Sequence, residues 1–72
     1  MTEKEKLSML EDLLEMEEGT LCKEQELSEL AEWDSVNRLS FIVMLDNEFG
    51  KEVSGEMIIG LAKVEDLLNL ME

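Results

Sequence analysis

The chain has 72 residues, of which nineteen are acidic and six basic, and its formal charge at pH 7 is −13. A chain of this length forms one domain, residues 1–72, whose small core leaves no room for a large built-in cofactor. It contains no histidine, so the usual general base and the commonest zinc ligand are absent. The acidic balance disfavours binding to nucleic acid or to an anionic membrane surface and favours basic protein partners. We therefore do not expect an autonomous enzyme.

The cellular setting is predicted from what the sequence lacks. No apolar run approaches the roughly 20 residues of a membrane span, so membrane insertion is not expected. The residues Met1–Lys6 lack the basic and apolar regions of a signal peptide. Cys22 is the single cysteine, which excludes an internal disulfide and suits the reducing cytoplasm. We interpret Cys22 as a half-buried residue of a connection.

The first segment has helical periodicity. Leu7, Leu10 and Leu14 recur at positions i, i+3 and i+7, which predicts an amphipathic helix over about Glu3–Glu17. Thr2 is a suitable N-cap. Gly19 lies just past the expected end, where glycine commonly follows a helix.

The next segment, from Glu18 to Trp33, loses this period. Leu21, Leu27 and Leu30 stand isolated among polar residues. A structureless loop of this length is unusual inside a small domain. We therefore predict a connection that its leucines pin to the core, with one short helical turn.

The second helix has the clearest boundaries, because Asp34 is a good N-cap and Gly50 is placed to end it. Apolar residues cover a broad arc of this helix, which predicts a helix buried over most of its circumference at the centre of the domain. They are Val36, Leu39, Phe41, Ile42, Val43, Leu45 and Phe49. The opposite arc holds Asn37, Ser40, Met44, Asn47 and Glu48. Met44 is either a scattered surface hydrophobe or an adaptable contact for several partners.

Two shorter helical segments follow. The apolar residues Met57–Ile59 lie between Gly55 and Gly60, which predicts one or two helical turns. A final helix is predicted from apolar residues at i, i+3, i+4 and i+7, namely Val64, Leu67, Leu68 and Met71. No capping residue precedes it, so its first turn is expected to fray. Strand alternation is absent throughout, and the predicted fold is an all-α, small four-helix bundle with three main helices and one short helix.

Residues for metal or acid–base chemistry are not found in a suitable pattern. The best candidate for a calcium loop begins at Asp46, but Lys51 stands where a glycine is required and Met57 where a bidentate glutamate is required. The neighbouring carboxylates Glu65 and Asp66 diverge on a helix and suit a solvated face. Neither a metal site nor a catalytic residue is predicted.

One motif points to a function. The segment Glu32–Val36 has the sequence Glu-Trp-Asp-Ser-Val, and Glu48-Phe49-Gly50 closes the same helix. Together with the order of the predicted helices over nearly the whole chain, this resembles the acyl carrier protein family. In that family an Asp-Ser-Leu triplet opens the second helix and an acidic-Phe sequence closes it. The triplet alone is a weak signal, whereas triplet, spacing and length together are fairly specific.

The resemblance implies a covalent cofactor. The hydroxyl of Ser35 would accept 4′-phosphopantetheine from coenzyme A through a separate phosphopantetheinyl transferase. Acyl groups would then travel as thioesters on the arm's terminal thiol. Asp34 would cap the helix and help to engage the transferase. The expected partners are this transferase and acyl-loading and acyl-processing enzymes, with the carrier itself a monomer that has no catalytic residue.

The departures from the family pattern concern the partner surface. Val36 replaces the usual leucine, and Trp33 replaces a small residue. Asn37, Arg38 and Ser40 stand where fatty-acid carriers have acids. We interpret the chain as a specialised stand-alone carrier of polyketide, peptide or modified-lipid synthesis rather than the housekeeping fatty-acid carrier.

Partner recognition on the second helix is expected to depend more on shape and apolar contact than on ion pairing. The predicted partner-binding residues are Val36, Asn37, Arg38, Ser40, Met44, Asn47 and Glu48. The acid-rich residues 1–34 would supply long-range attraction. The alternative function is an acidic helical adaptor that binds a basic protein and carries no prosthetic group.

Overall fold

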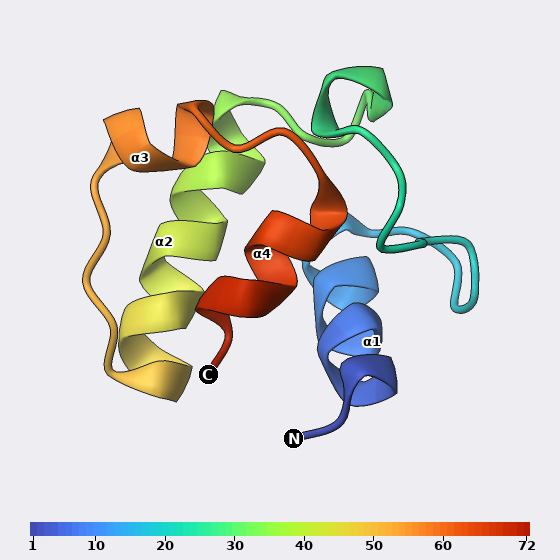
Figure 1. Cartoon of the computed structure of the whole chain (residues 1–72), viewed down its shortest axis with the longest axis horizontal. Helices are drawn as coiled ribbons and strands as arrows, with labels where there is room; N and C mark the ends of the chain where they lie inside the picture. Colours follow the sequence, from blue (N-terminus) through green and yellow to red (C-terminus); the bar gives the residue numbers. More distant parts are fainter.

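The computed structural model describes residues 1–72 and confirms the predicted all-α bundle. Its elements are α1 (Glu3–Leu14), the 3-10 turn η1 (Leu27–Glu29), α2 (Ser35–Phe49), α3 (Gly55–Ile59) and α4 (Val64–Leu70). In Figure 1, α2 runs antiparallel to α1, α4 lies between them, and α3 lies beside the first turns of α2. Both termini lie at the same end of the bundle, opposite the start of α2.

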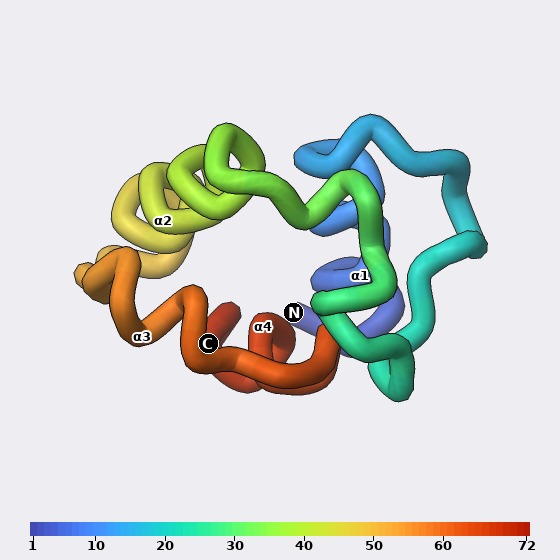
Figure 2. Tube along the Cα trace, turned by 90° about the horizontal axis from the view of Figure 1, so that it is seen from above, coloured from blue at the N-terminus to red at the C-terminus, as the bar shows by residue number.

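The core is one apolar cluster of twelve buried residues, to which all five helical elements and the connections between them contribute. Figure 2, seen from above, shows the segments arranged as a ring around this interior. Its members are Leu10, Leu14, Leu21, Leu27, Trp33, Phe41, Leu45, Ile58, Val64, Leu67, Leu68 and Met71. Since no element alone has enough apolar surface to fold, the cluster holds the short helices and the connections in place.

Helix α1 begins as predicted and ends earlier than predicted. The hydroxyl of Thr2 accepts the N–H of Glu5 at 3.2 Å, and the Glu5 carboxylate accepts the N–H of Thr2 at 2.9 Å. The expected extension to Glu17 is wrong, because Glu15 adopts a left-handed conformation with φ 58°. The N–H of Met16 then donates to the carbonyl of Glu11 at 2.8 Å and closes the helix.

A buried carboxylate fixes the chain after α1. Glu11 is 4% exposed and is the only buried charged residue. One of its oxygens accepts the N–H groups of Gly19 at 2.9 Å and of Leu21 at 3.0 Å. These bonds satisfy two backbone donors and direct the Leu21 side chain into the core.

The long connection is pinned to the core, as predicted, and includes one short turn, η1. Leu21 and Leu27 are buried and Leu30 is half-buried. The N–H of Leu27 also donates to the carbonyl of Ala62 at 2.8 Å, which ties the connection to the segment before α4. Cys22 is exposed, so the expectation of a half-buried cysteine is wrong.

The predicted fraying of α4 is not found, because tertiary contacts replace the missing cap. The N–H of Val64 donates to the carbonyl of Gln25, and the N–H of Glu65 donates to the carbonyl of Lys23, each at 3.0 Å. Asp66, in the first turn, accepts the N–H groups of Ala62 and Lys63, also at 3.0 Å. The connection therefore satisfies donors that an isolated helix would leave open.

The expectation that α2 is buried over most of its circumference is wrong. Phe41 and Leu45 are fully buried, whereas Val36, Leu39 and Val43 are 70%, 62% and 51% exposed. Helix α2 packs against α1 and α3 on one side only. A chain of 72 residues has no further element to cover the other side, so apolar side chains remain in solvent there.

None of the helices has both the length and the apolar composition needed to cross a membrane.

Removing the Glu11 carboxylate is expected to destabilise the bundle. Glu11→Ala leaves the N–H groups of Gly19 and Leu21 without an acceptor, which costs about 2–4 kcal/mol of unfolding free energy. Glu11→Gln keeps an oxygen acceptor and loses only the charge assistance, so it should cost less than about 1.5 kcal/mol. Urea unfolding measures both, with the exposed Asp12→Ala as control. Equal losses in the two Glu11 variants would contradict this role.

Acid unfolding should depend on Asp66. Hydrogen bonds from the backbone N–H groups of Lys63 and Ala62 lower the pKa of Asp66 below its ordinary value of 3.8. A carboxyl with a lowered folded pKa stabilises the fold above its ordinary value, and this contribution is lost as pH falls through the folded value. Asp66→Asn should therefore flatten the loss of stability as the pH falls below about 4. Urea midpoints across that range measure the slope, and identical slopes in both proteins would contradict the assignment.

Candidate functional site

Ser35, the residue singled out by the sequence, is the first residue of α2 and is exposed. Its hydroxyl makes no hydrogen bond within the chain, and the N–H groups of Ser35 and Val36 have no acceptor within it. Of the four α-helices, only α2 has no acidic residue in its first turn. The start of α2 therefore presents a free hydroxyl and two free N–H donors at the positive end of the helix dipole.

Asp34 is the N-cap of α2, as predicted. Its backbone is extended, with φ −105°, and its Oδ1 accepts the N–H of Asn37 at 2.8 Å. The Asp34 carbonyl accepts the N–H of Arg38 at 2.9 Å. These bonds fix the first turn of the helix without using the Ser35 hydroxyl, so Ser35 is not needed for capping.

Two side chains of the first turns fold back on the segment before the helix. The Asn37 amide donates to the carbonyl of Glu32 at 2.7 Å, and Nη1 of Arg38 donates to the carbonyl of Trp33 at 3.2 Å. Both side chains are half-buried. They were predicted as partner-binding residues, and in the structure they also brace the backbone on which Ser35 stands.

Trp33 anchors this segment in the core. It is 9% exposed, and its ring meets that of Phe41 edge-on, with the ring centroids 5.7 Å apart. Aromatic pairs at this distance and orientation contribute about 0.5–1.5 kcal/mol beyond their buried area. Sequence reasoning treated Trp33 only as a departure from a family pattern. Trp33 is the single tryptophan and stands two residues before Ser35. This large apolar side chain was the sequence feature that could have predicted a buried anchor.

The outer face of α2 carries an apolar stripe. Val36, Leu39 and Val43 are more than half exposed and lie at i, i+3 and i+7. A shallow groove of about 440 Å³ runs beside them, and its lining brings together four predicted partner residues with two that were assigned to the core. The lining consists of Leu39, Ser40, Val43, Met44, Asn47 and Glu48. Met44 is half-buried and packs against the core cluster, so it is not a scattered surface hydrophobe.

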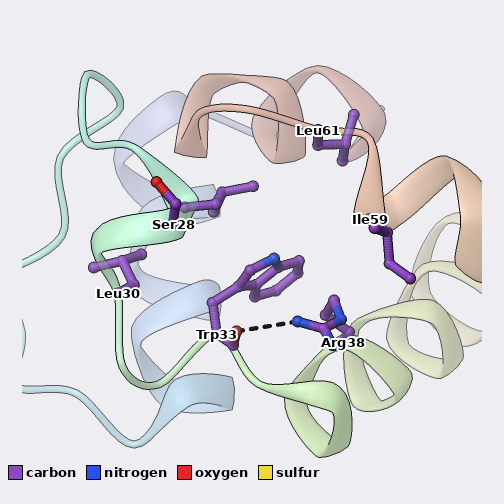
Figure 3. A pocket seen from close by; sticks show the side chains of 7 residues that line it. Ser28, Leu30, Trp33, Arg38, Ile59 and Leu61 are labelled. Carbon is purple, nitrogen blue, oxygen red and sulfur yellow. Dashed lines mark hydrogen bonds between the residues drawn. The ribbon is translucent and has the colours of Figure 1, made fainter.

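A second hollow lies between the connection, the first turns of α2 and the end of α3 (Figure 3). Its volume is about 270 Å³, and its lining is mostly apolar with one guanidinium. The lining residues are Leu27, Ser28, Leu30, Trp33, Arg38, Ile59 and Leu61. Sequence patterns do not indicate this pocket, because its walls come from three separate segments.

The charges around α2 and α3 remain unpaired. The two ion pairs of the molecule join Lys6 to Glu72 at 3.7 Å and Lys23 to Glu3 at 3.5 Å, both at the α1 side. No ion pair involves residues 32–56, and no group of His, Cys, Asp or Glu is arranged to hold a metal ion. The carboxylates that flank the apolar stripe are therefore free to meet a basic surface.

Comparison of the chain with protein-family models, with curated proteins and with solved structures finds no match.

Proposed function

We propose that this chain is an acyl carrier protein that bears 4′-phosphopantetheine on Ser35. The observation that carries the proposal is the state of the Ser35 hydroxyl, which is exposed, unbonded and held at the first position of a capped helix. Because Asp34 caps the helix, the Ser35 hydroxyl is not needed for capping and is free for modification. The resemblance of the Asp34–Val36 segment to the carrier triplet supplies the identity of the modification.

The attachment step needs no base from this chain. The Ser35 hydroxyl oxygen bonds to the phosphorus of the pantetheine arm while the pyrophosphate bond of coenzyme A breaks. Adenosine 3′,5′-bisphosphate leaves, and the hydroxyl proton passes to a base of the transferase. This division of labour suits a chain without histidine.

The residues at the start of α2 fit a phosphodiester. The free N–H groups of Ser35 and Val36 point from a helix N-terminus, where an anion is stabilised. The first turn itself holds no acid, so Asp34 at the cap is the one neighbouring carboxylate of α2 near the phosphate. Once bound, the arm supplies a terminal thiol that holds an acyl group as a thioester. The chain's own part is to hold Ser35 in place and to present the arm to partners, where tethering raises the local acyl concentration.

Replacing Ser35 should abolish modification and preserve the fold. Incubation with coenzyme A and a broad-specificity phosphopantetheinyl transferase should add one arm to the native chain, as seen in the intact mass. Ser35→Ala should gain no mass and keep its helical circular dichroism. Its free energy of unfolding should change by no more than about 0.5 kcal/mol, the usual effect of a surface substitution. Ser40→Ala is the matched control, because Ser40 also lies on α2 but donates to the carbonyl of Val36.

Two results would contradict the proposal. Modification that persists in Ser35→Ala would overturn the site. A native chain that stays unmodified, under conditions that modify a control carrier, would overturn the carrier function and favour an acidic helical adaptor without a prosthetic group.

We further propose that partner enzymes dock on the apolar stripe Val36–Leu39–Val43. The stripe begins beside Ser35, and the two carboxylates of α2, Asp46 and Glu48, are unpaired and lie beyond its C-terminal end. An apolar centre with a charged rim is the usual composition of a protein interface. The acid-rich half of the chain would raise the association rate, and the stripe would set the lifetime of the complex.

The variant Leu39→Lys tests this docking surface. Leu39 is 62% exposed, so the change should leave the fold intact. Loss of its apolar contact should lower kcat/KM for modification by about tenfold, equivalent to about 1.4 kcal/mol. Asn69→Lys, an exposed change of equal charge on α4, should alter it less than twofold. Equal effects of the two variants would mean that net charge, rather than the stripe, governs recognition.

A further inference from the structure

The pocket beside Ser35 contains the only arginine of the chain. Arg38 is half-buried and makes no ion pair, although the chain has nineteen acidic residues. A single hydrogen bond, from Nη1 to the Trp33 carbonyl at 3.2 Å, holds its guanidinium at the wall of the pocket. A guanidinium has five N–H donors in a planar fork. Most of its donors therefore have no acceptor within the protein.

The rest of the pocket is hydrocarbon. Figure 3 shows the Trp33 ring in the middle of the lining, with Arg38 and Ile59 on one side and Leu30 on the other. The volume of about 270 Å³ is slightly below the range of about 300–1,000 Å³ for small-molecule sites, which limits the pocket to a short group. At about 30 Å³ for a group the size of a water molecule, it accommodates roughly nine heavy atoms. An apolar wall with one fork-shaped cation suits a short amphiphilic anion.

We propose that the acyl group carried on Ser35 is short and ends in a free carboxylate, which Arg38 binds in this pocket. The inference rests on the proposed carrier function. Arg38 lies three residues after Ser35, which places the two side chains on the same face of α2, one turn apart. An arm attached to Ser35 that folds back over this face brings its cargo to the pocket. The methylenes lie against Trp33 and Ile59, and the carboxylate accepts two parallel N–H bonds from the guanidinium.

The net charge of the protein disfavours an anionic cargo unless a cation lies close to it. A carrier with a net charge of −13 repels an anionic cargo. Exposed carboxylates more than about 8–10 Å away are largely screened by salt, whereas a half-buried guanidinium in direct contact is not. One cation at the pocket wall is therefore enough to hold a terminal carboxylate locally.

The phosphodiester of the arm is the other anion within reach of Arg38. The free N–H groups of Ser35 and Val36 already suit that phosphate, and the Nη1 bond to Trp33 fixes the guanidinium at the pocket wall. We therefore assign Arg38 to the cargo, and the experiment separates the two sources.

The test compares two acyl groups of equal chain length. The apo protein is loaded enzymatically from coenzyme A, hexanoyl-coenzyme A and adipoyl-coenzyme A, and loading is verified by intact mass. In the native chain the adipoyl form should melt about 4–8 °C above the hexanoyl form, the size expected for one net charge-assisted contact in a domain of this length. Fluorescence of Trp33, the only tryptophan, should shift between the two forms.

Variants of Arg38 supply the control. Arg38→Gln should abolish the adipoyl–hexanoyl difference, and Arg38→Lys should retain part of it. Lys51→Gln removes an equal charge beyond the end of α2 and should leave the difference intact. Because each difference is taken within one variant, a change in basal stability cancels.

The outcomes distinguish this inference from the proposed function. If no form of the chain can be loaded, the carrier function fails. If the chain is loaded and the two acyl forms melt together, the carboxylate cargo is wrong and the carrier function stands. A third outcome is that the bare arm stabilises the native chain, that Arg38→Gln loses this gain, and that the adipoyl group adds nothing more. In that case Arg38 contacts the phosphodiester, and its assignment to the cargo is overturned.

Discussion

The packing of Trp33 against Phe41 is the contact on which the position of Ser35 depends. It joins the end of the long connection to the first buried turn of α2, with the two rings edge-on at 5.7 Å. Asp34 and Ser35 lie between these two anchors, so the buried contact and the Asp34 cap together hold the free hydroxyl in place. A chain with so few core residues must draw them from its connections, and here that need sets the position of Ser35.

The backbone donors at the helix starts are satisfied in different ways, and the helices also differ in the charge of their first turns. At α4, connection carbonyls and the Asp66 carboxylate accept the first N–H groups. At α1, Thr2 and Glu5 form a reciprocal cap, and the N–H groups of Glu3 and Lys4 stay free. At α2, Asp34 accepts one N–H, and those of Ser35 and Val36 stay free. The end proposed to receive a phosphodiester is thus the end that has no acid in its first turn.

Local patterns were sufficient to predict the helices and the all-α fold. Leu7, Leu10 and Leu14 mark the inner face of α1, and Asp34 and Gly50 mark the limits of α2, because caps and periodicity act within a few residues. Ser35 was also selected from its sequence neighbours alone, and the structure adds only that its hydroxyl is exposed and unbonded. These features depend on short-range backbone chemistry, which a sequence displays directly.

Which apolar residues are buried was decided only by tertiary structure. Val36, Leu39 and Val43 are as apolar as their buried neighbours, and they are exposed because no other segment reaches that side of α2. Likewise the pocket at Arg38 exists because the connection, α2 and α3 meet there. Periodicity shows which residues share a face of a helix. Whether another element covers that face depends on contacts between distant segments, and a chain of this length has too few elements to cover every apolar face.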